Sequence, residues 1–126
     1  MDKIIINGKE FITMVAISEE EQEKGLMYVS WPPPIMTFPF KKADFHKFWM
    51  KNTICPLDII FCMAGKIVDI CSGKPQDLTF LGPDAKVDMV VEMPAGTTNK
   101  CDIKIGNSID IKYSINTLAK KFSQYV

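Results

Sequence analysis

The sequence contains no arginine: all of its basic residues are lysines, and 15 basic residues balance 15 acidic ones, so the formal net charge is zero. Arginine is the side chain best suited to bidentate binding of phosphate, and nucleic-acid-binding domains carry clustered positive charge. We therefore expect no nucleic-acid partner. Long hydrophobic runs are also missing, since no segment approaches the ~20 apolar residues of a membrane span. The N-terminus shows no signal-peptide core. The sequence predicts a cytoplasmic protein with no membrane contact.

Closely spaced cysteine pairs and nucleophile motifs are absent as well. The four cysteines, Cys55, Cys62, Cys71 and Cys101, include no C-x-x-C pair, and His46 is the only histidine. Structural zinc sites usually take closely spaced ligand pairs, so we expect free, mostly buried thiols and no metal. A serine hydrolase is disfavoured because no G-x-S-x-G segment is present. Nothing in the chain indicates a cofactor.

What is present fits one small domain followed by a tail. A chain of 126 residues with 47% apolar residues is the right size for a single core. We predict a β-rich domain over residues 1–113 and an amphipathic helical tail over residues 114–126. The tail carries apolar residues at helical spacing, namely Ile115, Leu118, Ala119 and Phe122. This helix is expected either to close the open end of the domain or to contact another copy or another protein, and we favour the first.

Turn signals divide the domain into short strands. Asn7-Gly8 between two apolar runs predicts a first hairpin, and Ala64-Gly65 predicts a second one within residues 56–73. Ser18 followed by Glu21 has capping-box spacing and predicts a helix over residues 19–24. Three further regions complete the pattern. Residues 36–40 are predicted as a strand that Pro39 confines to an edge or a bulge, residues 41–45 as a turn, and residues 46–53 as a strand.

The remaining segments predict a loop over residues 74–85, a strand over residues 86–96, a helical turn, and a last strand after a turn at Gly106-Asn107. Seven or so short strands with two or three short helices indicate a mainly β fold. We expect a small, mostly antiparallel β-barrel or sandwich-like domain.

Five segments in this order resemble a known family: "EEEQEKGLMYV", "FWMKNTICPLDIIF", "GKIVDI", "VVEMPAG" and "DIKIGNSIDI". They are similar to the domain of unknown function family 192, also called uncharacterised protein family 0127, over roughly Val15 to Ile111. The resemblance implies a small β-rich barrel with short helices and brings no established reaction. The matching positions with an implied structural role are Gly25, Leu26, Met27, Phe48, Met50, Thr53, Pro56, Leu57, Gly96 and Gly106.

The chain departs from that family at several positions. Ile35 stands where a glycine is usual, Pro39 stands where a strand donor is expected, and Gln76 follows Pro75 in place of a cysteine. Asn107 replaces the aspartate of the last turn, and we expect no leader of the kind that many relatives carry. These differences argue against any activity that needs a thiol at position 76 or a carboxylate at position 107.

One polar constellation could form a functional site. If residues 46–53 form a strand, Trp49 and Lys51 point to the same face, and Asp58 can return on the next strand to meet Lys51 or Asn52. In the functional interpretation these four residues, with Glu92 as a second acid, form a ligand pocket with an aromatic wall. In the structural interpretation Asn52 and Thr53 bond the turn backbone, Asp58 accepts from those donors, and Glu92 is a strand-end charge exposed to water. We favour the structural interpretation.

The sequence therefore favours a non-enzymatic binding, accessory or structural protein, such as a capsid-decorating component of a phage particle, in which case it would be located in the virion. Its contacts with itself or another protein would use the C-terminal tail or the proline loop "WPPPIMTF". The alternative is a small-ligand-binding or catalytic pocket built on the residue 48–58 block.

Overall fold

A computed structural model describes residues 1–123, and residues 124–126 at the end of the predicted tail lie outside the described residues. The elements are β1 (Lys3–Ile6), β2 (Lys9–Ile12), β3 (Met14–Val15), α1 (Glu19–Lys24), β4 (Met36–Asp44), β5 (Leu57–Met63), β6 (Lys66–Gly73), β7 (Val87–Pro94), α2 (Thr97–Lys100), β8 (Ile109–Lys112) and α3 (Ile115–Ser123). The fold is mainly β with three short helices, as predicted.

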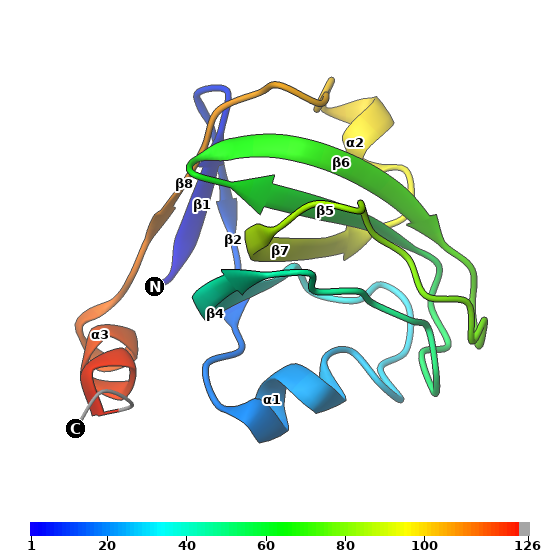
Figure 1. Ribbon diagram of the computed structural model, residues 1–126, viewed down its shortest axis with the longest axis horizontal. Coiled ribbons are helices and arrows are strands. Elements are labelled where there is room, and N and C mark those ends of the chain that lie inside the picture. The colour runs from blue at the N-terminus through cyan, green and yellow to red at the C-terminus, as the bar shows by residue number, and fades with distance from the viewer. Residues whose placement is uncertain (124–126) are drawn as a thin grey trace.

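The strands form two sheets that do not close into one barrel. The smaller sheet has the order β2-β1-β8, and the larger one has the order β3-β4-β7-β5-β6. All neighbouring strands are antiparallel except β3 and β4, which are parallel. In Figure 1, α1 lies below the larger sheet and α2 lies above it. Of the two predicted architectures, the sandwich-like one is found.

The central strands β5 and β7 of the larger sheet are buried on both faces, and each face carries its own apolar cluster. Side chains of successive strand residues point to opposite faces. On β5, Leu57, Ile59 and Phe61 therefore join the cluster on the α1 side. Ile60 and Cys62 join the cluster between the two sheets. Strands buried on both faces read as continuous apolar runs, which explains the "LDIIFCM" and "VDMVVEM" segments.

Most predicted elements are confirmed. The first hairpin turns at Asn7 and Gly8, whose φ angles of 51° and 84° match the two positive angles of a type I′ turn. The second hairpin turns at Ala64 and Gly65, also with positive φ. The helices predicted after Ser18, after Gly96 and in the tail all form. Pro39 lies where the register of β4 against β7 shifts, as expected for a proline at a bulge.

Two predicted elements are wrong. Residues 41–44 belong to β4 and do not form a turn, because the strand resumes pairing with β7 at Asp44 after the irregularity. Residues 46–53 do not form a strand. They pair with the loop before β7 through one isolated bridge between Phe48 and Leu81, and Asn52 then reverses the chain with a φ of 56°. The segment has a strand-like composition, but no strand lies beside it.

Candidate functional site

A cleft of about 230 Å³ opens on the α1 side of the larger sheet. Two of the five residues proposed from the sequence line it, Trp49 and Glu92. Its other lining residues come from α1 and the turn after it, from β4, and from residues 46–53: Gln22, Glu23, Lys24, Gly25, Leu26, Met27, Phe38, Phe40, His46, Lys47, Phe48 and Thr53. The cleft volume is below the ~300 Å³ lower end for drug-sized ligands, so it suits a small molecule.

Strand alternation places the Glu92 carboxyl group in this cleft. On β7, Met89, Val91 and Met93 pack between the sheets, whereas Val90 packs on the α1 side. Glu92 therefore points to the α1 side, where it lies between Met36 of β4 and Ile59 of β5 in the register. Its side chain is only 5% exposed, so the expectation of a water-exposed strand-end charge is wrong.

Gly25 packs closely against the side chains that face the cleft. A Cβ atom at Gly25 would lie 3.6 Å from Glu92 Oε1 and only 3.3 Å from Phe38 Cζ, so both side chains lie against the end of α1. Gly25 has a φ of 49°, a conformation that disfavours side chains. A glycine at the end of α1 therefore allows Phe38 and Glu92 to approach this close.

Glu92 has no hydrogen bond or ion pair to any side chain or backbone group in residues 1–123 that the structure records. A buried ionised carboxylate without a partner is costly, so burial alone raises the pKa of Glu92 to about 8. A carboxyl group with this pKa is mostly protonated at neutral pH and can exchange its proton with a ligand. Strongly perturbed acids in clefts are a common mark of functional sites.

Aromatic side chains form most of the apolar lining. Phe48 packs edge-on against Phe38, with ring centroids 5.0 Å apart, and against Phe40 at 6.3 Å. The His46 ring stacks on Phe40 at 3.6 Å. Trp49 stacks on Phe80 at 5.3 Å and stands at the cleft opening, where it is partly exposed. These contacts hold the aromatic rings in place without a ligand, so the cleft is largely pre-formed.

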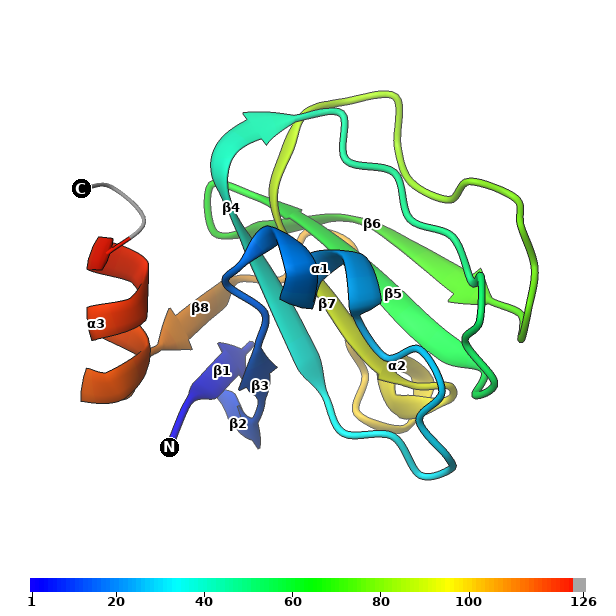
Figure 2. The same ribbon diagram turned by 90° about the horizontal axis from the view of Figure 1, so that it is seen from below.

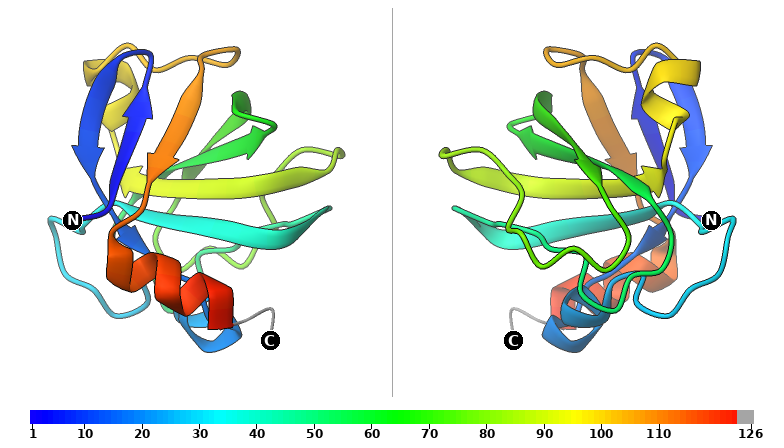
Figure 3. Two further views of the ribbon diagram at one scale, coloured as in Figure 1. Left: turned by 90° about the vertical axis from the view of Figure 1, so that its left-hand side faces the viewer. Right: turned by 90° about the vertical axis from the view of Figure 1, so that its right-hand side faces the viewer.

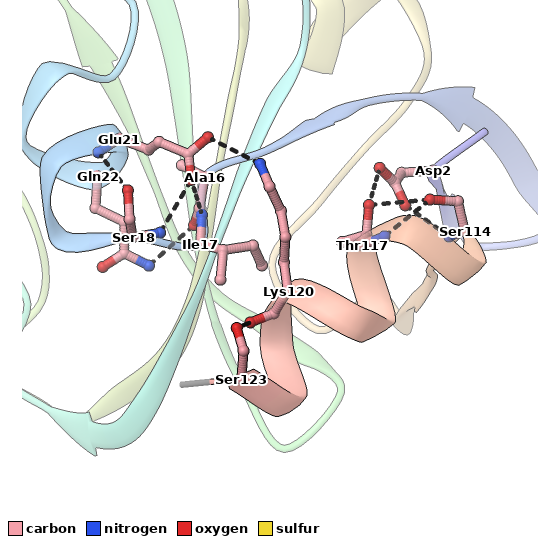
Figure 4. Close-up of polar contacts among 10 residues, drawn as sticks. All are labelled: Asp2, Ala16, Ile17, Ser18, Glu21, Gln22, Ser114, Thr117, Lys120 and Ser123. Atoms are coloured by element: carbon pink, nitrogen blue, oxygen red, sulfur yellow. Dashed lines mark hydrogen bonds and ion pairs between the residues drawn. The ribbon is translucent and has the colours of Figure 1, made fainter. Parts of the chain in front are cut away.

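The opposite wall is α1, a helix of six residues. Ser18 and Glu21 form the predicted capping box, with the Glu21 amide donating to Ser18 Oγ at 3.0 Å. Gln22 Nε2 donates to the backbone oxygens of Ala16 (3.0 Å) and Pro39 (2.9 Å), which fixes α1 to β4. Figure 4 shows the capping box and the Gln22 bond to Ala16. Figure 2 shows α1 lying across the larger sheet.

Three further polar side chains of the lining are held by contacts to the protein. Lys47 Nζ donates to the Gly82 oxygen at 2.7 Å and to Asp84 Oδ1 at 3.0 Å. His46 Nε2 lies 3.1 Å from the Lys42 oxygen. Thr53 Oγ1 donates to the Lys51 oxygen at 3.2 Å. The polar atoms of these three side chains are bonded to protein groups. Among the lining residues, Glu92 is buried and faces the cleft without a partner in residues 1–123.

Asp58, a further residue proposed from the sequence, lies on the other face of the sheet. It pairs with Met93, the neighbour of Glu92, so the two acids point in opposite directions. Asp58 Oδ2 accepts from the amides of Gly96 (3.1 Å) and Thr98 (2.9 Å) and from Thr98 Oγ1 (2.8 Å). These bonds place Asp58 at the start of α2.

Lys51 and Asn52 occupy the turn beyond the cleft and do not line it. Lys51 is exposed, with Nζ 5.1 Å from the centroid of the Trp49 ring, a cation–π distance. The Asn52 oxygen accepts from the Tyr28 amide at 2.9 Å. The structure thus brings together Trp49 and Glu92 from the predicted constellation and separates Lys51, Asn52 and Asp58 from Glu92.

The positions to which the family resemblance assigns a structural role lie in the core, in turns or in the cleft lining. Leu26, Met50 and Leu57 are buried in the α1-side cluster, and Phe48 packs against it. The others shape turns or the cleft. Gly96 and Gly106 have φ angles of 94°, the Pro56 oxygen accepts from the Ala95 amide, and Met27 and Thr53 line the cleft.

Sequence reasoning missed most of the cleft, including the roles of Gly25, Phe38 and Phe40. These residues come from segments that the chain separates by tens of positions, and their contacts depend on how α1 folds back onto β4. One signal was available: a single glutamate inside the apolar strand "VVEMP" must be buried on one face of a two-sided sheet.

All four cysteines are free thiols; Cys55 and Cys62 are buried, and Cys71 and Cys101 are half-buried. Burial raises the pKa of the Cys62 thiol to about 12, so this thiol is protonated and unreactive at neutral pH. Within residues 1–123, no three His, Cys, Asp or Glu side chains are grouped so that they could hold a metal ion. None of the helices in that range is long and apolar enough to cross a membrane.

Comparison with known proteins places this fold in a family. The sequence model of DUF192, described as "Uncharacterized ACR", matches residues 3–111. The crystal structure of a protein of unknown function from Novosphingobium aromaticivorans DSM 12444 is similar, with a TM-score of 0.80 and 29% identity; the match covers 86% of this chain and 83% of that one. A "putative transcription regulator" from Sinorhizobium meliloti 1021 has a TM-score of 0.77 and 27% identity, covering 86% and 90%. No curated protein matches the sequence.

Proposed function

We propose that this chain, which belongs to the DUF192 family, binds a small organic molecule in the cleft between α1 and the larger sheet. The observation that carries the proposal is Glu92, a residue only 5% exposed whose carboxyl group reaches a largely pre-formed aromatic cavity without a protein partner. A folded protein normally pairs its buried polar groups. A carboxyl group left without a partner next to empty space is therefore best explained by a ligand that supplies the partner.

The proposed role is binding without catalysis. General acid–base chemistry usually needs a second group within reach of the reacting atoms. The His46 ring is stacked on Phe40, and its Nε2 contacts a backbone oxygen. Cys55, which lies near the cleft in the same apolar cluster, donates its thiol to the Val29 oxygen. Glu92 thus acts as a recognition group for the ligand.

The test is a fragment screen by two-dimensional amide NMR, with neutral, cationic and anionic fragments in equal numbers. The expected result is at least one group of fragments that shifts the amide signals of Gly25, Phe48 and Glu92 together. The Met27→Trp variant, which adds bulk to the lining at constant charge, should lose these shifts. Fragments that bind only outside the cleft, or no fragment binding to the folded protein, would overturn the proposal.

A second candidate function is supported by α3. Ile115 and Phe122 of this helix are 85% and 68% exposed, so the helix does not close the domain with its apolar face, in contrast to the expectation from the sequence. It is held instead by polar contacts. Asp2 accepts from the Ser114 amide (2.7 Å) and from Thr117 Oγ1 (2.8 Å), and Lys120 Nζ lies 3.7 Å from Glu21 Oε2 (Figure 4).

We propose that this exposed face binds a second copy of the chain. Figure 3 shows α3 beside α1, at the end of the molecule away from the β1–β2 hairpin turn. An accessory or capsid-decorating role would use the same surface. The proline loop, with Trp31 exposed, is the other surface proposed from the sequence, and no further observation favours it.

A further inference from the structure

We propose that the ligand of the Glu92 cleft is a small organic cation, a protonated amine attached to an apolar or aromatic body. This inference rests on the proposed ligand-binding function and adds the chemical class of the ligand. It is carried by the hydrogen-bonding groups that the cleft leaves available and by the nature of its walls.

Most side-chain donors that line the cleft already have acceptors in the protein. Both hydrogens of Gln22 Nε2 are directed to backbone oxygens, and the Thr53 hydroxyl donates to the Lys51 oxygen. Lys47 Nζ is held between the Gly82 oxygen and the Asp84 carboxylate. The donors of these three residues are therefore engaged, and a ligand that needs donors finds few inside the cleft.

The donors that remain lie at the opening. They are the Lys24 ammonium group and the Trp49 indole N–H, and both residues are exposed. Glu23, beside Lys24 on α1, is also exposed and contributes an acceptor of opposite charge. The interior therefore offers the Glu92 carboxyl group, which donates and accepts when protonated and only accepts when ionised. The complement of the ionised form is a donor, and a positively charged donor makes the stronger bond to a carboxylate.

The aromatic walls also favour a cation. Ring faces attract cations electrostatically, most strongly when water is excluded. The protein shows this preference at the cleft opening, where Lys51 Nζ lies 5.1 Å from the centroid of the Trp49 ring. Phe38 and Glu92 both lie against Gly25 and both line the cleft, so an ammonium group that binds the Glu92 carboxylate from the cleft would lie beside an aromatic ring.

Binding a cation requires an ionised Glu92. The charged groups around it are Glu23 and Lys24 from α1 and His46 and Lys47 from the opposite wall, and the latter two are engaged elsewhere. Burial raises the pKa of Glu92 to about 8 in the empty cleft. The amine then binds with loss of the Glu92 proton to solvent, and the complex contains one carboxylate and one ammonium ion. Affinity should therefore increase with pH up to about 8.

The experiment compares three probes of similar shape by amide NMR titration: 2-phenylethylamine, 2-phenylethanol and phenylacetate. We expect the amine to bind at least tenfold more tightly than the alcohol, and phenylacetate to bind least. The amine stays protonated between pH 6 and pH 8, so its affinity should follow the ionised fraction of Glu92 and increase about ninefold from pH 6 to pH 7 and about fivefold from pH 7 to pH 8. The affinity for the alcohol should stay constant.

Two variants separate the role of Glu92 from general effects. Glu92→Gln keeps the shape of the side chain and removes its charge, so it should lower the amine affinity at least tenfold and remove its pH dependence, and it should lower the alcohol affinity much less than the amine affinity. Glu10→Gln, at an exposed carboxylate on β2, should change neither the amine affinity nor its pH dependence. Loss of all binding in the folded Glu92→Gln variant would indicate a role in shaping the cleft and overturn the charge argument.

The outcomes distinguish this inference from the proposed function. Equal binding of the amine and the alcohol in the cleft, or tighter binding of phenylacetate, overturns the cation inference and keeps a ligand-binding cleft. Failure of all three probes overturns the cation inference, and the unbiased fragment screen then decides separately whether the cleft binds any small molecule.

Discussion

Glu92 lies on β7 between two apolar residues and pairs with Met36 and Ile59, which are also apolar. Its protonation state connects the stability of the fold to pH. Its folded-state pKa of about 8 lies above the ordinary value of 4.5. Below pH 4.5 the Glu92 carboxyl group is neutral in the folded and the unfolded state, so its ionisation does not lower the free energy of unfolding. As the pH rises above 4.5 the unfolded state ionises first, so stability decreases until the pH passes about 8, where the decrease levels off.

We therefore expect Glu92→Gln to remove this decrease. Relative to the variant, the wild-type protein should lose about 3 kcal/mol of unfolding free energy between pH 5 and pH 8, at 1.36 kcal/mol per pKa unit. Urea unfolding at both pH values measures the difference. Glu10→Gln serves as the matched control, since its carboxylate is exposed. Parallel pH profiles of the wild-type protein and Glu92→Gln would contradict the expectation.

Asp58 is a different case, because its carboxylate oxygen accepts three hydrogen bonds at the start of α2. Its replacement by alanine leaves the amides of Gly96 and Thr98 without this acceptor. We expect Asp58→Ala to lower the unfolding free energy by about 2–4 kcal/mol, the range for losing charged hydrogen bonds at a buried site. Urea unfolding measures this effect. Fragment binding in the cleft should be unchanged, and lost binding at unchanged stability would restore Asp58 as a site residue.

At the scale of the element, α1 is too short to be stable as an isolated helix. Contacts at its ends and along its side hold it: the capping box at Ser18, the Gln22 bonds to the neighbouring backbone, and Gly25 at its end. Because α1 is one wall of the cleft, these contacts also determine the shape of the site. The sequence predicted the helix and its cap because both are local features.

We expect Ser18→Ala to lower the unfolding free energy by about 1 kcal/mol, the usual effect of losing an N-cap hydroxyl. The Glu21 amide, which donates to that hydroxyl, should exchange its hydrogen faster. Chemical unfolding and amide exchange measure the two effects. The control is Ser123→Ala at the exposed end of α3, which should change stability by less than about 0.5 kcal/mol. Equal effects of both variants would show that the capping box contributes little.

The predictions for residues 41–44 and residues 46–53 are wrong because pairing with a neighbouring strand decides whether a segment forms a strand. Residues 46–53 are rich in aromatic and apolar residues, yet only the loop around Leu81 lies beside them. Residues 41–44 are polar and look like a turn, yet they continue β4 because β7 lies beside them. Strand formation depends on a neighbour that is distant in the sequence, so composition alone could not assign these two segments.

For the whole molecule, the exposed side chains of α3 predict association. We expect the molar mass from light scattering to rise with concentration above the 14.2 kDa of one chain. The double variant Ile115→Ser/Phe122→Ser should stay at the mass of a monomer, because burial of these side chains is the main gain from contact. The bonds from Asp2 to Ser114 and Thr117 are untouched, so α3 should remain in place.

The matched control for this experiment replaces two exposed apolar residues elsewhere, Phe45→Ser/Ile105→Ser. This variant should associate as the wild-type protein does. A wild-type protein that remains a monomer at every concentration would remove the self-association proposal, and loss of association in both double variants would assign it to general surface hydrophobicity.

The sequence by itself determined the local features of this protein: the two hairpins, the capped helix α1, the amphipathic α3, the mainly β class and the family. Each depends on residues within a few positions of one another, where turn angles, caps and periodicity act directly. The tertiary structure alone decided that Glu92 and Asp58 occupy opposite faces and that Glu92 meets the aromatic rings in front of Gly25. The physical reason is that strand pairing sets the direction of a strand side chain, and packing sets which side chains it contacts. Both depend on segments that lie far apart in the chain.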